Sequence, residues 1–398
     1  MADYFQKVLT DVSSNLYVER YEVGSENLVG YDGPAWRVSK FALKGGKQHG
    51  VDVVELDNGH MTVVVVPTRG MGILEARAAG VRLGWESPVR RPVHPAYVDE
   101  EARGMLGWLE GFSEMVCRCG LSYHGAPGED VIRTNTGAEK RVVLPLHGTI
   151  ANAPASRLLV RVQLAPPYEL SVSGEILDTQ MYGAAYRLTS TVSTVPGSAE
   201  FTVSDEVENL SGMTAELELL YHCNYGPPLL GEGARIVAPF EYVCPRDARA
   251  AEDTATWDVY GAPEAGFEEQ CYFLRNHADE QGRTMVALLA ADGALAATIR
   301  YSVADLPAFT VWKNTSARAD GYVTGLEPGT DYPNSRMFER SKGRVLELGP
   351  GGTHSAALTF GLAAGAEAVA RAEQEVAALS RGKDSRVSGE PDPDYCPA

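Results

Sequence analysis

Hydrophobic and polar residues alternate in short runs along most of the chain, which is the pattern of β-strands with one buried face. Turn-forming segments such as Asp57-Asn58-Gly59 separate these runs at spacings typical of an antiparallel sandwich. The alternation predicts strands over residues 50–56, 61–66, 158–164, 169–176, 186–194, 199–207, 215–221, 295–301 and 308–312.

Helical periodicity is present in only three segments, at residues 3–15, 99–109 and 365–381. No glycine-rich phosphate loop follows a strand, and strands do not alternate with helices, which argues against a nucleotide-binding α/β fold. We therefore predict an all-β antiparallel supersandwich with few short helices, forming a single domain over residues 1–381. Residues 382–398 are rich in Asp, Pro, Ser and Gly, so we expect a mobile tail.

Charge and composition narrow the range of partners. The 398 residues carry 35 basic and 53 acidic side chains, a net charge of -18 that would repel a nucleic-acid backbone. Small neutral or cationic ligands fit that charge better. No apolar run reaches the roughly 20 residues of a membrane helix, and the first residues lack the features of a signal peptide. We predict a cytoplasmic protein with no nucleic-acid or membrane partner.

Six cysteines stand at positions 117, 119, 223, 244, 271 and 396. Their spacing does not match that of a zinc site, and Cys117-Arg118-Cys119 is too tight for the usual motif. We predict buried reduced thiols and no metal site.

A glutamate at the end of a β-rich run is the first candidate for chemistry. If residues 322–327 form a strand, Val323, Gly325 and Glu327 share one face. Gly325 would then leave room for a ligand beside the Glu327 carboxylate. The alternative is an ordinary hairpin end, marked by Pro328 and Gly329, with a solvated glutamate.

Two further segments carry histidines. Between residues 216 and 226, alternation places His222 and Asn224 on a polar face, which is either solvent-facing sheet or the lining of a concave cleft. In the loop at residues 144–155, His147 and Asn152 stand five positions apart. Such a loop can present donors to a polyol or satisfy its own backbone.

In order and spacing, these segments resemble the galactose mutarotase-like (aldose 1-epimerase-like) superfamily. The resemblance spans most of the chain and is strongest to a branch known as a domain of unknown function, DUF4432. Its hallmarks here are Pro67-Thr68-Arg69-Gly70-Met71, Cys119-Gly120-Leu121, Leu146-His147-Gly148 and Leu326-Glu327-Pro328-Gly329-Thr330.

The resemblance implies roles for three side chains: Glu327 as general base, His222 as general acid, and His147 as a donor or acceptor near the reacting carbon. Interconverting anomers requires taking the proton of the C1 hydroxyl while protonating the ring oxygen, so one base and one acid must flank the hemiacetal. The ligand would be a small-molecule carbohydrate, and neither a metal nor an organic cofactor is needed.

Other polar side chains are expected to contact the substrate. Asn152 belongs to the His147 loop, whereas Arg69 could either form an ion pair at a sheet edge or donate to ligand hydroxyls. Arg118 stands where the resemblance implies a small polar residue, and its guanidinium would suit an anionic sugar. Glu269 could line the site or form a surface ion pair. We assign no role to His124.

We predict a cofactor-independent aldose 1-epimerase that acts on a free sugar or sugar acid. One alternative is a keto-sugar epimerase or isomerase that abstracts a proton from carbon and would therefore incorporate solvent deuterium. Another is a non-catalytic carbohydrate-binding protein, which a separation of more than about 8 Å between Glu327 and His222 would favour. An exposed sheet edge would be compatible with a homodimer.

Overall fold

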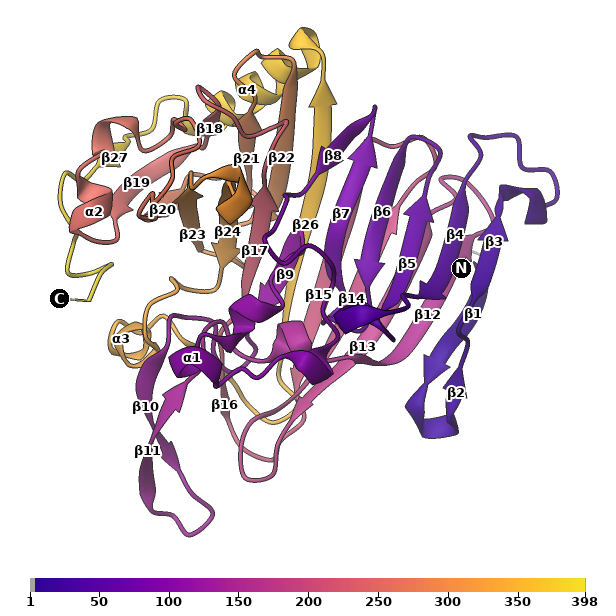
Figure 1. The fold of residues 1–398 in the computed structure, drawn as a ribbon, viewed down its shortest axis with the longest axis horizontal. Coiled ribbons are helices and arrows are strands. Elements are labelled where there is room, and N and C mark those ends of the chain that lie inside the picture. The colour runs from indigo at the N-terminus through magenta and orange to yellow at the C-terminus, as the bar shows by residue number, and fades with distance from the viewer. Residues whose placement is uncertain (1–3, 398) are drawn as a thin grey trace.

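Two large antiparallel sheets packed face to face make up most of the molecule (Figure 1). The computed structural model describes residues 4–397. The predicted all-β antiparallel class is confirmed.

The first sheet has ten strands. In spatial order they are β18 (Arg235–Val237), β21 (Arg283–Leu289), β22 (Leu295–Ser302), β26 (Thr353–Ala364), β15 (Glu200–Asn209), β14 (Ala185–Thr194), β13 (Leu170–Thr179), β12 (Ala155–Gln163), β1 (Tyr4–Asp11) and β2 (Leu16–Tyr17). On β14 and β15, buried positions alternate with more exposed ones, as expected for strands with one face in the core.

The second sheet has thirteen strands and carries the candidate site. In spatial order they are β27 (Arg386–Val387), β19 (Phe240–Pro245), β20 (Gln270–Asn276), β23 (Ala308–Asn314), β24 (Val323–Gly329), β17 (Leu220–Tyr225), β9 (Val116–Cys119), β7 (Gly72–Ala78), β6 (Met61–Val66), β5 (Asp52–Asp57), β4 (Arg37–Ala42) and β3 (Tyr21–Gly24), with β8 (Val81–Leu83) paired to β7.

Smaller elements surround the sandwich. The β10–β11 hairpin (Gly128–Arg133 and Glu139–Leu144) extends away from the sheets in Figure 1, and β16 (Ala215–Leu217) pairs with β25 (Leu346–Leu348). The α-helices within residues 4–397 are α1 (Ala102–Met105), α2 (Ala248–Ala251), α3 (Arg336–Ser341) and α4 (Ala366–Ser380). No helix in this range is long and apolar enough to cross a membrane.

The nine predicted strands are all present, although the run at residues 215–221 divides between β16 and β17. The helix at residues 365–381 is confirmed as α4, and residues 99–109 form only short helical turns. The helix expected at residues 3–15 is wrong: Tyr4–Asp11 is β1, which pairs with β12, and residue 3 lies outside the described range. A long-range strand pairing overrides the local helical pattern there.

The core lies between the two sheets, where side chains such as Val63 and Val65 of one sheet and Val160 and Val172 of the other are fully buried. Strands β17 and β24 are buried at every position. One face of each of these two strands packs into the core. Because every position is buried, the opposite face of each strand must be covered as well. The candidate site is on that second face.

The segment predicted to be a mobile tail, residues 382–398, contacts the sheet in the part that the structure describes. Residues 386–387 pair in parallel with β19, and the Tyr242 hydroxyl donates to Asp392 at 2.8 Å. Tyr395 packs on Tyr242 and Tyr332, with ring centroids 5.0 and 5.4 Å apart. The segment has few apolar residues, but Tyr395 and Cys396 pack with Tyr242, Phe273 and Tyr332 of the main body. Residue 398 lies outside the described range.

The six cysteines are free and buried, as predicted.

Candidate functional site

A cavity of about 660 Å³ opens on the outer face of β17, β23 and β24. Its volume is within the range of roughly 300–1,000 Å³ found for small-molecule sites. Trp85, Trp108, Phe112 and Trp312 form much of its wall. The cavity therefore offers an apolar enclosure, into which the sheet presents a few polar side chains.

Glu327 and His222 meet on the floor of this cavity. Cys223 of β17 pairs with Leu326 of β24, so continuing that antiparallel register places His222 opposite Glu327. Their Nε2 and Oε1 atoms are 3.2 Å apart, and the side chains are 6% and 3% exposed. Within residues 4–397, Glu327 Oε1 has no hydrogen-bond partner of good geometry. The carboxylate oxygen is thus available to a ligand.

Gly325 keeps this arrangement open. A Cβ atom at position 325 would collide with Glu327 Oε1 and lie 3.0 Å from His222 Cε1. Any larger residue would displace the carboxylate, as the shared face of Gly325 and Glu327 predicts.

The tautomer of His222 follows from its neighbour Asn224. The Asn224 amide nitrogen donates to the carbonyl oxygens of Glu114 and His222, at 3.0 Å in both cases. Its amide oxygen therefore faces His222 Nδ1, 2.7 Å away, and accepts a hydrogen bond from Nδ1–H. In the neutral imidazole, Nε2 then carries the lone pair and faces Glu327.

Burial reverses the usual order of the two pKa values in this pair, so that the pKa of Glu327 lies above that of His222. It raises the pKa of Glu327 to about 8, helped by the charge of Glu269 and opposed by His124 and Arg246. It lowers the pKa of His222 well below its ordinary value, with the neighbouring His147 acting in the same direction. Near neutral pH the pair therefore carries a single proton, which burial favours on Glu327.

His147 completes the polar part of the floor. It adopts a left-handed backbone conformation, with φ of 59°, and its ring centroid is 5.5 Å from that of His222. Nδ1–H donates to the carbonyl oxygen of His124 at 2.8 Å, which leaves Nε2 as an acceptor. Burial lowers the pKa of His147 to about 4, so it is neutral.

The mouth of the cavity is held by a second hydrogen-bonded group. Trp312 Nε1 donates to Glu269 at 2.7 Å, and the other carboxylate oxygen of Glu269 accepts from Arg246 at 3.1 Å. Glu269 thus lines the cavity and forms an ion pair at the same time. Trp108 and Phe112, which core packing alone could have explained, also face the cavity.

Arg69 and Asn152 contact each other and do not line the cavity. The Arg69 guanidinium is buried, pairs with Glu114, and donates to Asn152 Oδ1 at 2.7 Å. The Asn152 amide nitrogen donates to Glu100 at 3.0 Å. These two residues are therefore not placed to contact a substrate, contrary to the expectation. Their polar atoms instead bind neighbouring residues of the surrounding loops.

Arg118 is likewise removed from the cavity. Its side chain points into the core between the sheets and is fully buried there. It pairs with Asp205 of β15 and donates to Ser190 at 2.6 Å and to the carbonyl oxygens of Gly70 and Met71 at 2.9 Å. This corrects the expected contact with substrate, and with it the argument from Arg118 for an anionic sugar.

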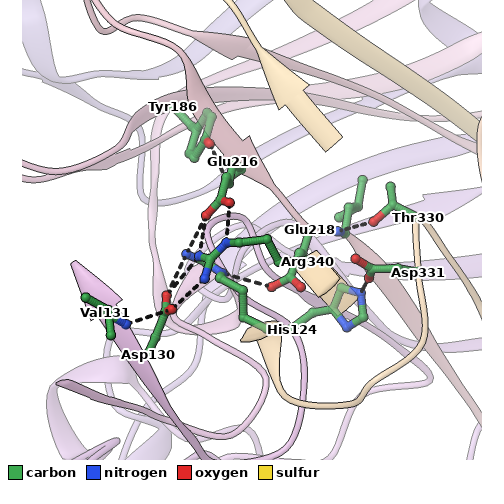
Figure 2. Close-up of polar contacts among 11 residues, drawn as sticks. His124, Asp130, Val131, Tyr186, Glu216, Glu218, Thr330, Asp331 and Arg340 are labelled. Atoms are coloured by element: carbon green, nitrogen blue, oxygen red, sulfur yellow. Dashed lines mark hydrogen bonds and ion pairs between the residues drawn. The ribbon is translucent and has the colours of Figure 1, made fainter. Parts of the chain in front are cut away.

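Sequence reasoning missed His124, which lies behind the site with its side chain fully buried against Asp331 (Figure 2). Burial alone would lower the pKa of His124, but the charge and hydrogen bond of Asp331 raise it to about 9. Its carbonyl accepts from His147, and its partner Asp331 follows β24, which carries Glu327. His124 therefore connects the two halves of the site. The signal in the sequence was a single histidine between Tyr123 and Gly125, which is too weak to interpret alone.

Figure 2 shows that His124 and Asp331 lie beside a network of charged side chains, some of which are partly exposed. Arg340 bridges Asp130 and Glu216, and Arg336 contacts Glu218 at 3.4 Å. Burial, and then the charge of Asp331, raises the pKa of Glu218 to about 8. Arg336 thus pairs with carboxylates of this network.

Comparison with solved structures places the chain among galactose mutarotase-like β-sandwich proteins. A protein of Klebsiella pneumoniae, provisionally named an aldose 1-epimerase, is 33% identical and has a TM-score of 0.91, with 97% of this chain and 98% of that one covered. A galactose mutarotase-like protein of Clostridium acetobutylicum is 14% identical, with a TM-score of 0.58 and coverage of 82% and 98%. Galactose 1-epimerase of Lactobacillus acidophilus is 11% identical, with a TM-score of 0.53 and coverage of 82% and 99%.

At the level of sequence families, residues 48–362 match the family described as a domain of unknown function, DUF4432. The chain belongs to this family, as its motifs indicated. No curated protein matches the sequence.

Proposed function

We propose that this protein is a cofactor-independent aldose 1-epimerase, with Glu327 as base and His222 as acid acting on a free sugar or sugar acid. The observation that carries the proposal is the 3.2 Å separation of Glu327 Oε1 and His222 Nε2 in an aromatic-walled cavity. The two reacting oxygens of a hemiacetal are bonded to the same carbon. An acid and a base this close together can each reach one of these two oxygens.

The reaction begins when the shared proton lies on His222 Nε2 and Glu327 is ionised. Glu327 takes the proton of the C1 hydroxyl, His222 gives its proton to the ring oxygen, and the bond between C1 and the ring oxygen breaks. The products are an open-chain aldehyde, a protonated Glu327 and a neutral His222. That is also the protonation state that burial favours for the empty pair.

Ring closure reverses the transfers after rotation about the bond between C1 and C2. Glu327 returns a proton to the aldehyde oxygen, and His222 recovers one from the hydroxyl that attacks C1 from the opposite face. Asn224 Oδ1 accepts from His222 Nδ1–H throughout and stabilises the imidazolium form. The neutral Nε2 of His147 is an acceptor that can orient a sugar hydroxyl.

The aromatic wall supports the proposal in a second way. Phe112 and Trp312 stand against His222, with ring centroids 5.0 and 5.3 Å from its ring. Such rings can pack on the apolar face of a pyranose and keep water from the proton-transfer pair.

Exchange NMR in deuterated water tests the proposal on a panel of neutral and anionic aldoses and ketoses. We expect faster anomer exchange without deuterium at carbon, and loss of the acceleration in Glu327→Gln. Glu367→Gln makes the same chemical change on exposed α4, far from the cavity lining, and should leave the rate unchanged.

Carbon-bound deuterium in the product would replace the proposal with an isomerase that abstracts a proton from carbon. Binding of a sugar without any anomer exchange would indicate a non-catalytic carbohydrate-binding protein instead. Full activity of Glu327→Gln would remove Glu327 from the mechanism.

A further inference from the structure

A second cavity, of about 470 Å³, lies directly beside the candidate site. The two cavities share Trp85, Ser87, Pro88 and Val89 as a common wall. The charges in the second cavity differ from those of the chain as a whole. Its lining contains the arginines Arg77, Arg82, Arg90, Arg91 and Arg318 and the glutamates Glu75 and Glu86.

The carboxylates do not balance these arginines. Glu75 contacts both Arg77 and Arg82, so its single charge is shared between two guanidinium groups. Within residues 4–397, the remaining arginines Arg90, Arg91 and Arg318 form no ion pair. Five guanidinium groups thus face two carboxylates, on a chain whose net charge is -18. A local surplus of this kind attracts anions that the rest of the surface repels.

A buried hydroxyl in the same wall points to a ligand independently of the arginines. Ser113 lines the cavity and is 5% exposed, and its Oγ has no hydrogen-bond partner within the described residues. Buried hydroxyl groups without a partner are uncommon, because leaving one unsatisfied costs roughly 1–3 kcal/mol. An oxyanion in the cavity would supply the missing acceptor.

The wall between the two cavities consists of two packed segments. A Cβ atom at Gly321 would lie 3.1 Å from both Pro88 Cδ and Trp85 Cζ3, so the turn that contains Arg318 packs on the segment beginning at Trp85. Arg318 lines the arginine-rich cavity, and Asp320 lines the candidate site. One turn thus places an arginine in one cavity and an aspartate in the other.

We propose that the arginine-rich cavity is a binding site for a tetrahedral oxyanion of the phosphate or sulfate class. Arg90, Arg91 and Arg318 supply the charge, and Ser113 supplies a hydroxyl donor. The oxyanion is either free or attached to a ligand that extends over the shared wall from the candidate site. Guanidinium groups suit this chemistry because they donate paired hydrogen bonds to such groups.

Calorimetric titration of the full chain with inorganic phosphate, at pH 7.5 and low ionic strength, tests the site without relying on turnover. We expect saturable binding that weakens about tenfold or more in Arg90→Ala/Arg91→Ala, because two charge-assisted contacts are lost. The control Arg133→Ala/Arg141→Ala removes the same charge from the exposed β10–β11 hairpin and should bind like the wild type. Ser113→Ala should weaken binding to a smaller extent.

Glucose 6-phosphate and glucose, titrated in the same way, distinguish the sources of the anion. Tighter binding of the sugar phosphate, in competition with phosphate, indicates an anion attached to a sugar, whereas equal affinity indicates a free anion. Three results would overturn the site: no saturable binding of phosphate, equal weakening in both double variants, or loss in Arg103→Ala alone, since Arg103 lines the candidate cavity.

These titrations measure binding, so their outcome does not depend on whether the protein catalyses anomer exchange.

Discussion

Two buried pairs of histidine and carboxylate lie close to each other in this protein and are opposite in character. His222 and Glu327 face the cavity with 3.2 Å between their nearest atoms, whereas His124 and Asp331 are in contact behind it. Burial and neighbouring groups lower the pKa of His222 and raise that of Glu327 to about 8. The pKa of His124 rises instead, to about 9.

The neighbours of each imidazole account for the difference. His222 binds the neutral amide of Asn224 and has His147 and aromatic rings around it, so the one hydrogen bond to Asn224 only partly offsets the cost of burying its charge. His124 has Asp331 in contact and the carboxylates of Glu218 and Glu339 near enough to raise its pKa. One pair is therefore a fixed ion pair, and the other holds a proton that can move.

The comparison separates two uses of the same residue types. A fully charged pair is structural, because removal of either partner would leave the other charge buried and unpaired. A pair that shares one proton can give and take protons in the same reaction step. Residue types alone do not distinguish these cases, but the groups that surround each imidazole do.

The largest effect is expected from Glu327→Gln, which removes the base and keeps the shape. Turnover should fall on the order of 10²- to 10⁴-fold, the usual contribution of acid–base catalysis. Stability at pH 9 should rise, because the variant no longer buries a carboxylate that must ionise above about 8. Anomer-exchange NMR and urea unfolding at pH 9 measure the two effects. A loss of stability would show that Glu327 is structural.

Asp331→Asn should instead reduce stability. It removes the partner of a buried imidazolium, at a cost of about 3 kcal/mol in the free energy of unfolding at pH 7. Urea unfolding followed by circular dichroism measures this cost. Asp32→Asn, the same change at an exposed position, serves as control and should have no effect. Equal stability of both variants would contradict the fixed ion pair.

The two pairs also predict two overlapping windows of pH-dependent stability. Each has a group whose pKa is raised on folding, so each contribution is complete below the unfolded pKa and is lost as pH rises through the folded value. The window runs from 6.5 to about 9 for His124, and from 4.5 to about 8 for Glu327.

Unfolding free energies measured from pH 4 to 10 test these windows. The slope within a window should be at most about 1.4 kcal/mol per pH unit for each group. Glu327→Gln should remove the lower window and Asp331→Asn the upper one. Identical profiles for wild type and both variants would refute the assignment.

The smallest effect is expected from making the first pair resemble the second. Asn224→Asp places a carboxylate on His222 Nδ1, so the pKa of His222 should rise and its proton should be held more tightly. We expect turnover to fall about tenfold, the equivalent of one hydrogen bond to a charged group. NMR of the imidazole nitrogens reports the charge, and Asn224→Ala serves as the control without added charge. A ring that stays neutral in Asn224→Asp would contradict the explanation.

Alternation predicted the strands, and the motifs predicted the three side chains that meet in the cavity. The predictions that failed concern side chains whose ion-pair partners are distant in the sequence. Asp205 interrupts the inward-facing row of Phe201, Val203 and Val207 on β15, and that interruption was the signal that a buried cation, Arg118, lies across the core. His124 could not be interpreted without Asp331, and no local pattern connects the two.

Strands β17 and β24 pair although more than a hundred residues separate Leu219 from Thr330, which hydrogen-bonds to it beside the site. Loops this long close slowly, because their entropy is lost before the contacts form. We therefore expect the acid and the base to come together late in folding. After dilution from denaturant, anomer exchange should return more slowly than far-ultraviolet circular dichroism, so that activity reports the final stage of assembly.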